Sequence, residues 1–180
     1  MGNPKESGLI VGVDLAGSER RPTGIALLGR TLSTKTVHAE EEILEACRGA
    51  GLVAIDAPLS LPRKGGLRKG DRELIRMGYR VFPPLFSRMR MLTRRGMGLA
   101  AKLRREGIRV IEIHPRTSGL ILFGTEDRRL WLRKLARLGV KRTASEHELD
   151  AALAALTGKL YLEGKTRKVG NIVIPLKARA

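Results

Sequence analysis

Three aspartates lie where they can form a shared reaction centre. Asp14 ends a β-branched run that begins at Leu9, Asp56 ends a second run that begins at Leu52, and Asp150 lies early in a helical segment. If the two runs are neighbouring strands, their ends bring Asp14 and Asp56 together, and the helix can pack Asp150 against them. Carboxylates this close repel one another until a divalent cation neutralises them. Hard oxygen ligands favour Mg²⁺ or Mn²⁺ over zinc.

The chemistry that such a group supports is hydrolysis of a phosphodiester bond. Asp14 is expected to be the central or bridging metal ligand, flanked by Asp56 and Asp150, because two metal ions can activate water and stabilise the departing oxygen. His147 precedes Asp150 by three residues, so both lie on one helix face. We expect His147 to shuttle a proton or to contact phosphate. The structural alternatives are turn formation by the strand-end aspartates and a solvated helix position for Asp150.

The elements that must position these residues read as an α/β domain. Three strands at hairpin-like spacing come first, then a helix, then a fourth strand that stops before Ala57-Pro58. The ranges are Leu9–Asp14, Thr23–Leu28, Thr34–His38, Glu40–Arg48 and Leu52–Asp56. A strand over Ile108–His114 follows later. The final long helix begins at Ser145, which forms a capping box with Glu148.

Residues 57–95 read as a basic insertion or lid, because prolines and glycines interrupt them. Helices are expected over about Arg68–Met77 and Met91–Glu106. Near the C-terminus, Asn171–Leu176 is apolar, but Pro175 predicts an edge strand or a docked tail within residues 164–180. At 180 residues, the sequence predicts a single domain over 1–180.

The charge balance indicates a polyanionic partner. The chain has 35 Lys plus Arg against 18 Asp plus Glu, a formal charge of +17. Such a charge attracts nucleic acid, either DNA or RNA, through its phosphates. The sequence has only three Phe, two Tyr and one Trp, so extensive base stacking is not expected. The predicted phosphate contacts, which could also be only a solvated face, are Arg63, Lys64, Arg68, Lys69, Arg72, Arg88, Arg90, Arg94 and Arg95.

Four motifs together resemble domain-of-unknown-function family 429. They are Val11-Gly-Val-Asp-Leu-Ala-Gly17, Ala54-Ile-Asp-Ala-Pro-Leu-Ser-Leu-Pro62, Ile111-Glu-Ile-His-Pro115 and Glu146-His-Glu-Leu-Asp-Ala151. The family is regarded as predicted nucleases with a ribonuclease H-like fold, and the resemblance runs from about Leu9 to Pro175. It implies a five-stranded mixed sheet of order 3-2-1-4-5 flanked by helices. It also assigns catalytic roles to Asp14, Asp56 and Asp150, with Glu112 as an additional acid.

Several residues have two interpretations. Glu112 lies in an apolar strand, where either a metal or an ion pair with Arg116 would compensate its burial. Asp71 either caps the insertion helix or gates the site. His114 is a weaker candidate, whereas His38 is expected to be structural and Cys47 to lie in the core. Ribonuclease H proper adds a glutamate from its first helix, but no motif singles out one of Glu41, Glu42 and Glu45.

The predicted function is that of a divalent-metal-dependent nuclease, and two alternatives remain. One is a non-catalytic nucleic-acid-binding domain. The other is a phosphotransferase or ATPase related to actin-like proteins, which the length disfavours because those proteins place nucleotide between two such domains. The lone cysteine, the lack of a secretion-signal pattern in residues 1–8 and the lack of a long apolar run predict a cytoplasmic protein outside the membrane. Substrate structure and oligomeric state stay open.

Overall fold

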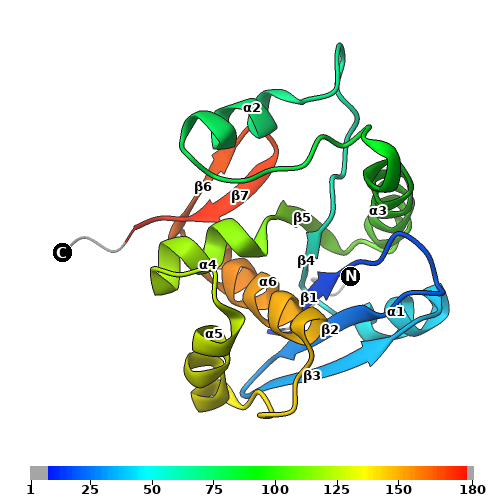
Figure 1. Ribbon diagram of the computed structural model, residues 1–180. Coiled ribbons are helices and arrows are strands. Elements are labelled where there is room, and N and C mark those ends of the chain that lie inside the picture. The colour runs from blue at the N-terminus through cyan, green and yellow to red at the C-terminus, as the bar shows by residue number, and fades with distance from the viewer. Residues whose placement is uncertain (1–7, 178–180) are drawn as a thin grey trace.

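The computed structural model describes residues 8–177, so residues 1–7 and 178–180 lie outside this description. Its centre is a seven-stranded mixed sheet of order β3-β2-β1-β4-β5-β7-β6 (Figure 1). The first five strands follow the predicted order 3-2-1-4-5, and two further strands extend the sheet beyond β5. The strands are β1 Ile10–Asp14, β2 Thr23–Leu28, β3 Leu32–Val37, β4 Leu52–Asp56, β5 Arg109–Ile113, β6 Thr166–Val169 and β7 Ile172–Pro175.

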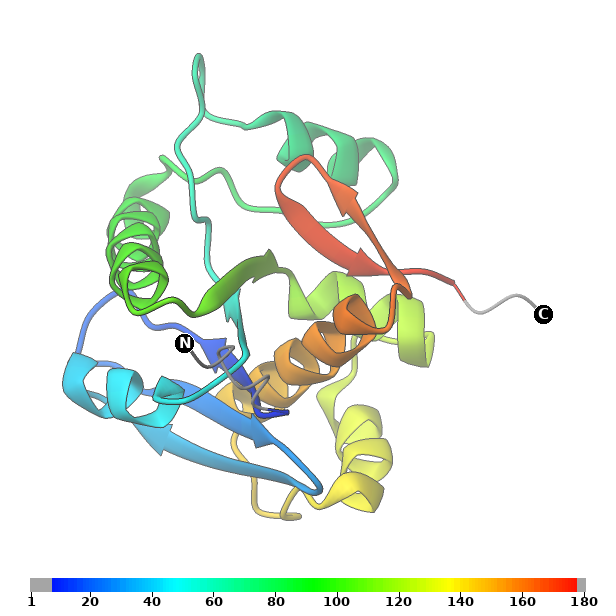
Figure 2. The same cartoon turned by 180° about the vertical axis from the view of Figure 1, so that it is seen from behind.

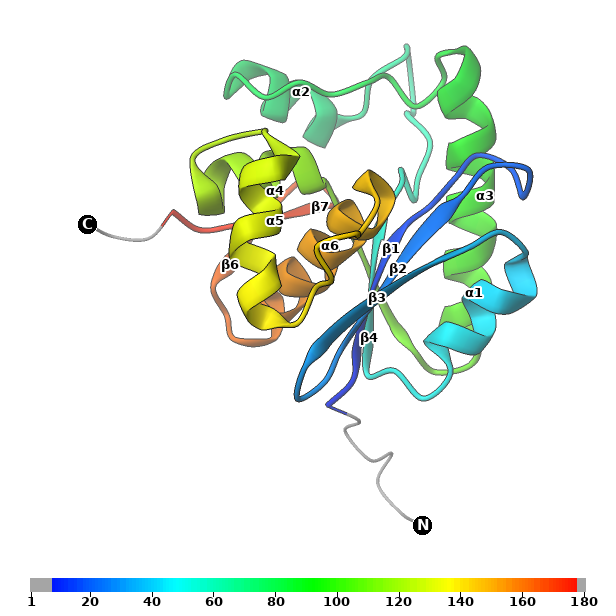
Figure 3. The ribbon, with the colours of Figure 1, turned by 60° about the horizontal axis from the view of Figure 1, so that its bottom comes forward.

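Helices cover both faces of this sheet. Figure 3 shows α1 and α3 on one side and α4, α5 and α6 on the other. The helices are α1 Glu40–Cys47, α2 Lys69–Arg76, α3 Ser87–Arg105, α4 Pro115–Phe123, α5 Arg128–Leu135 and α6 Glu146–Leu162, with a 3-10 turn at Ala136–Leu138. Helix α3 begins four residues before the expected Met91. No helix in residues 8–177 is long and apolar enough to cross a membrane.

The alternation of side chains along the strands divides the core into two layers. Val11, Val13 and Ile25 point toward α1 and α3, whereas Ile10 and Ala26 point toward α5 and α6. Buried apolar area of this kind is the main favourable contribution to folding. Because each face of the sheet has its own helical cover, the polar ends of the strands lie at the rim between the two layers.

The C-terminal segment forms a hairpin rather than an edge strand or docked tail. Strand β7 lies between β5 and β6, pairing parallel with the former and antiparallel with the latter. Pro175 is tolerated because it stands at the end of β7. The hairpin and α2 lie side by side (Figure 2), and Leu74 packs against Val169 and Ile174. Helix α2 of the insertion is therefore fixed to the extended sheet.

Candidate active site

Asp14 and Asp56 end two neighbouring parallel strands in the same register. Strands β1 and β4 pair from Ile10 opposite Leu52 to Asp14 opposite Asp56. Residues directly opposite one another in a ladder project to the same face of the sheet. The predicted adjacency of the two strand ends is therefore confirmed.

Helix α6 reaches this pair because two glycines let its backbone approach the sheet. A methyl group at Gly12 of β1 would overlap the backbone oxygen of Ala151, and one at Gly24 of β2 would overlap that of His147. The start of α6 is fixed by the predicted capping box. Ser145 Oγ accepts the Glu148 N–H at 3.2 Å, and Glu148 Oε2 accepts the Ser145 N–H at 2.7 Å.

The three aspartates converge. One carboxylate oxygen from each of Asp14, Asp56 and Asp150 lies within 4.8 Å of the others. Loss of solvation, followed by the charge of Asp14, raises the pKa of Asp56 well above its ordinary value. Burial likewise raises the pKa of Asp150, against the opposing effect of Arg128. The structure thus holds like charges together at a cost.

The donor set fits a hard divalent cation. It consists of carboxylate oxygens alone, the ligand type that Mg²⁺ and Mn²⁺ prefer. Within residues 8–177, the Asp56 side chain has no hydrogen-bond or ion-pair partner. Besides the loss of solvation, the charges of Asp14, Asp150 and Glu112 all raise its pKa, and only the weaker effect of the Arg128 charge opposes them. A bound cation would supply the missing compensation.

His147 and Arg128 each form hydrogen bonds with one of the three aspartates. His147 Nδ1 lies 2.7 Å from Asp14 Oδ2, and this hydrogen bond raises the pKa of the half-exposed imidazole. Arg128 donates two hydrogen bonds to Asp150, from Nε at 2.9 Å and from Nη2 at 2.6 Å. The His147 contact agrees with its expected place beside the acids. The Arg128 contact was not foreseen, because nothing in its local sequence indicates that α5 packs its N-terminus against α6.

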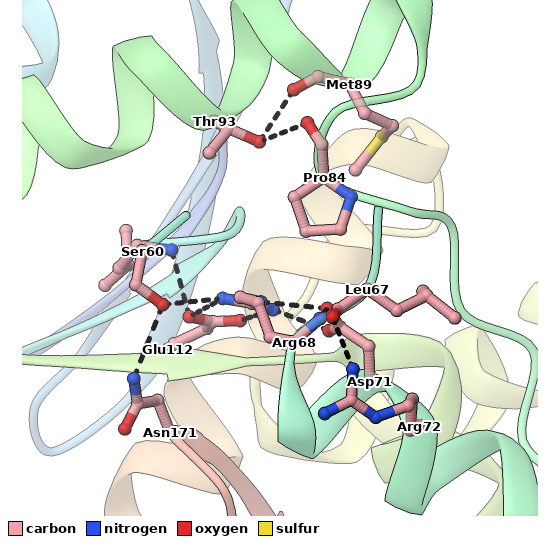
Figure 4. A network of polar contacts seen from close by, with 11 residues as sticks. Ser60, Leu67, Arg68, Asp71, Arg72, Pro84, Met89, Thr93, Glu112 and Asn171 are labelled. Atoms are coloured by element: carbon pink, nitrogen blue, oxygen red, sulfur yellow. Dashed lines mark hydrogen bonds and ion pairs between the residues drawn. The ribbon is translucent and has the colours of Figure 1, made fainter. Parts of the chain in front are cut away.

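Glu112 belongs to a second network of hydrogen bonds and ion pairs, shown in Figure 4. Arg68 binds both oxygens of Glu112, at 2.8 and 2.6 Å, and both oxygens of Asp71, at 2.9 and 2.7 Å. The backbone N–H of Leu59 also donates to Glu112 Oε2 at 2.9 Å. The ion-pair partner of Glu112 is therefore Arg68, not the expected Arg116. Asp71 caps α2 by accepting the Arg68 N–H at 2.8 Å, in agreement with its capping interpretation.

This network joins the insertion to the sheet beside the three aspartates. Glu112 lies on β5, whereas Arg68 and Asp71 belong to the start of α2. Glu112 is not one of the three converging acids. Its additional catalytic role stays a prediction, and its contacts are those of a structural anchor.

Two cavities open on either side of the acids. One, of about 190 Å³, is lined by Asp56 and Asp150 together with residues of the insertion and of α4. The other, of about 540 Å³, is lined by Asp14, His147, Arg21 and Arg88. Arg88 was among the predicted phosphate ligands, and Arg21 was not, because it stands outside the basic insertion.

The other basic residues predicted to contact phosphate differ in exposure and in whether their side chains already bind other groups of the protein. Arg68 is only 10% exposed and fully engaged by carboxylates. Arg95 donates to the backbone oxygens of Ala16 and His38, so it braces the loop that follows Asp14. Arg72 donates to the Leu67 oxygen. The exposed members are Arg63, Lys64, Lys69, Arg72, Arg88, Arg90 and Arg94.

The remaining candidates lie outside the cluster of acids. His114 is partly buried at the N-terminus of α4, where its Nδ1 lies 2.7 Å from Thr117 Oγ1, and loss of solvation lowers its pKa to about 4. Cys47 is buried in the core, as expected, which raises its thiol pKa to about 12. Glu42 accepts backbone N–H groups at the start of α1, so this glutamate serves as a helix cap.

The family resemblance is borne out by a direct match. The model of a protein family of unknown function, DUF429, matches residues 12–172. The chain belongs to this family. A search of curated proteins returns no match.

Solved structures with the same fold come from T. thermophilus. RuvC in complex with a Holliday junction substrate is 18% identical, with a TM-score of 0.54 over 89% of this chain and 98% of that one. A second Thermus thermophilus RuvC structure is 15% identical, with a TM-score of 0.52 over 93% and 99% of the two chains. These likenesses confirm the predicted ribonuclease H-like α/β fold.

Proposed function

We propose that the protein is a divalent-metal-dependent nuclease that hydrolyses phosphodiester bonds in nucleic acid. The observation that carries this proposal is the convergence of Asp14, Asp56 and Asp150 at the ends of β1 and β4 and the start of α6. The ribonuclease H-like fold supports it, as does the RuvC relative of that fold solved with a Holliday junction substrate. The formal charge of +17 supports a phosphate-rich partner.

Each residue of the site has a definable role in this proposal. Asp14, Asp56 and Asp150 would hold Mg²⁺ or Mn²⁺, which when bound supplies Lewis-acid activation of water and charge stabilisation at the departing oxygen. His147 holds a proton beside Asp14 and, at 47% side-chain exposure, can exchange it with solvent or substrate. Arg128 orients Asp150 by binding both of its oxygens.

Surrounding charges favour substrate approach to this site. Arg21 and Arg88 line the larger cavity next to Asp14 and His147. Phosphate contacts of this kind position a nucleic acid without reading its sequence. They offset the negative charge of the acids for an incoming polyanion.

The proposal is tested by cleavage of labelled DNA, RNA, hybrid and branched substrates with and without Mg²⁺ or Mn²⁺. Wild type is expected to cleave at least one substrate only when metal is present. Asp14→Asn is expected to lose at least 100-fold in rate, because removal of a metal-holding charge impairs metal-assisted catalysis. A metal-independent activity shared by wild type and Asp14→Asn would contradict the proposal.

One observation favours the non-catalytic alternative. Arg128 already neutralises Asp150 through two short hydrogen bonds, and such a pair can stabilise an acid without metal. Under this alternative, the protein binds nucleic acid equally well in EDTA and in Mg²⁺, and no substrate of the panel is cleaved. Retained binding without cleavage in any metal would therefore select it.

A further inference from the structure

Exposed apolar side chains gather on the insertion. Among the described residues, the exposed large apolar side chains within 61–91 are Leu61, Ile75, Met77, Phe82, Phe86 and Met91. Phe82 and Phe86 are 61% and 68% exposed, and the chain has only three phenylalanines. Leaving two of them in water on a basic segment indicates a binding role rather than a packing one.

Phe82 lines the 190 Å³ cavity beside the acids, whereas Phe86 does not. Val81, Met89 and Leu92 contribute further apolar surface, and Asp56 and Asp150 border the same space. In Figure 4, Met89 lies across from the Arg68, Asp71 and Glu112 network, whose polar groups already bind one another. The polar groups on this side of the cavity therefore already have hydrogen-bond partners. The apolar side chains on the opposite side are the ones left to contact a ligand.

Arg116 provides a free positive charge at this cavity. It is half-buried on α4 and lines the space, yet no carboxylate or other hydrogen-bond partner is found for its guanidinium in residues 8–177. A partly exposed guanidinium without a protein partner keeps its N–H donors free, so it can bind an anion. Next to a cluster proposed to hydrolyse phosphodiesters, the matching anion is a phosphate of the substrate.

We propose that this cavity receives one unpaired nucleotide next to the scissile phosphate, with its base against Phe82 and a neighbouring phosphate at Arg116. This inference rests on the proposed nuclease function and names its substrate class, a nucleic acid with an unpaired nucleotide at the cleavage position. The cavity is smaller than the roughly 300–1,000 Å³ of pockets for drug-sized ligands, so it suits a single ring system. A base inside a continuous duplex is stacked on both faces and cannot present a face to Phe82.

The residues that line the cavity favour a nucleobase over an apolar side chain of a partner protein. An aromatic ring stacks on any base, and flanking cations hold the phosphates on either side. An aliphatic side chain of a partner protein would gain nothing from Arg116 or from the +17 charge of the chain. Phe82 is thus assigned to base stacking, a contact that the small number of aromatic residues does not lead one to expect.

The test measures binding in the Asp14→Asn background, where cleavage does not consume the probe. The probes are a DNA duplex with a single unpaired 2-aminopurine and the same duplex fully paired. The unpaired probe is expected to bind more tightly and to lose fluorescence as its base stacks on Phe82. Adding Phe82→Ala should weaken its binding roughly tenfold and restore the fluorescence, with little effect on the paired duplex.

Phe86→Ala is the matched control, because Phe86 is similarly exposed on the same segment but does not line the cavity. It should leave the preference for the unpaired probe intact. Arg116→Gln should weaken binding and reduce the slope of log K against log salt by about one, as expected for one lost phosphate contact. Equal losses in Phe82→Ala and Phe86→Ala, or no loss in either, would overturn the proposal.

Cleavage by wild type separates this inference from the function on which it rests. If wild type cleaves paired and unpaired substrates at equal rates, the pocket assignment fails while the nuclease proposal stands. If wild type cleaves neither but Phe82→Ala still abolishes the binding preference, the pocket stands and the nuclease proposal fails.

Discussion

Asp14 and Asp56 face one another across the parallel ladder of β1 and β4, and neither strand continues beyond them. Two carboxylates held in register are repelled by each other and, here, by Asp150 as well. The arrangement is therefore poorly compensated without a cation, and its stability should depend on one.

Asp56→Asn should stabilise the metal-free protein by about 1–2 kcal/mol, because it removes a desolvated like charge. The same change should remove the additional stability that Mg²⁺ or Mn²⁺ gives to wild type. Urea unfolding in EDTA and in metal measures both effects. The exposed Glu41→Gln is the control: it should leave the metal-induced gain unchanged and lower the metal-free stability by less than about 1 kcal/mol, through the lost charge at the start of α1. A metal-induced gain in Asp56→Asn equal to that of wild type would show that the cation binds elsewhere.

Arg128→Gln should lower the free energy of unfolding in EDTA by about 2 kcal/mol, since Asp150 then loses its charged partner while remaining buried. Metal should restore more stability to this variant than to wild type. Arg129→Gln is the matched control, because Arg129 is 91% exposed and pairs only with Asp127. Thermal unfolding with and without Mn²⁺ is the measurement. An equal metal response in Arg128→Gln and wild type would mean that Arg128 and the cation do not share Asp150.

Gly24→Ala should displace the start of α6, because the added methyl group meets the backbone of His147 and Glu148. We expect a loss of about 3 kcal/mol of stability, typical of overpacking against backbone, and weaker metal binding. Gly29→Ala provides the control, since nothing lies within 4 Å of its added carbon. Chemical denaturation of both variants measures the loss of stability, and metal titration measures the change in metal affinity. Unchanged metal affinity in Gly24→Ala would show that the position of α6 against the sheet does not determine the geometry of the metal site.

Glu112→Gln separates a structural anchor from a metal ligand. Its contacts with Arg68 and Leu59 predict a loss of about 2–3 kcal/mol of stability, because a buried guanidinium is left partly unpaired. Metal affinity should change by less than about threefold, in contrast to the loss expected for Asp14→Asn. Denaturation and calorimetric metal titration provide the two readouts. Loss of metal binding without loss of stability would instead make Glu112 a fourth acid of the site.

His114 should give the protein a pH-dependent stability. Its pKa is lowered from 6.5 to about 4 by burial, so the unfolded chain binds more protons than the folded one between these pH values. The contribution of His114 to stability is therefore fully present above pH 6.5 and falls, by roughly 3 kcal/mol, as pH decreases through this window. His114→Asn should show a smaller decrease than wild type from pH 7 to pH 4.5, with pH 8 as the internal reference. Equal decreases in stability with pH in wild type and His114→Asn would contradict the lowered pKa of His114.

The sequence indicates the three acids well because their positions depend on local signals. Strand ends at Asp14 and Asp56 follow from apolar runs, and the start of α6 follows from the Ser145 capping box. Adjacency of β1 and β4 was a topological inference, and the observed register confirms it.

Features that depend on tertiary packing were not predictable in this way. Strand β6 reads Thr-Arg-Lys-Val, whose two central basic side chains are exposed, so its apolar signal is minimal. The pairing of Arg68 with Glu112 joins residues 44 positions apart, and that of Arg128 with Asp150 joins residues 22 apart. Residues that line a cavity from several elements, such as Phe82 and Arg116, carry no common sequence pattern.

Manganese binding followed by cleavage in the same samples tests the central claim most directly. Mn²⁺ is titrated into wild type and into Asp14→Asn, Asp56→Asn and Asp150→Asn while bound metal is measured by electron paramagnetic resonance, and labelled substrates are then added. We predict that wild type binds Mn²⁺ and cleaves, and that each substitution weakens binding and reduces cleavage together. Undiminished Mn²⁺ binding in all three variants, or cleavage that persists in them, would contradict the claim that these aspartates form a metal-dependent active site.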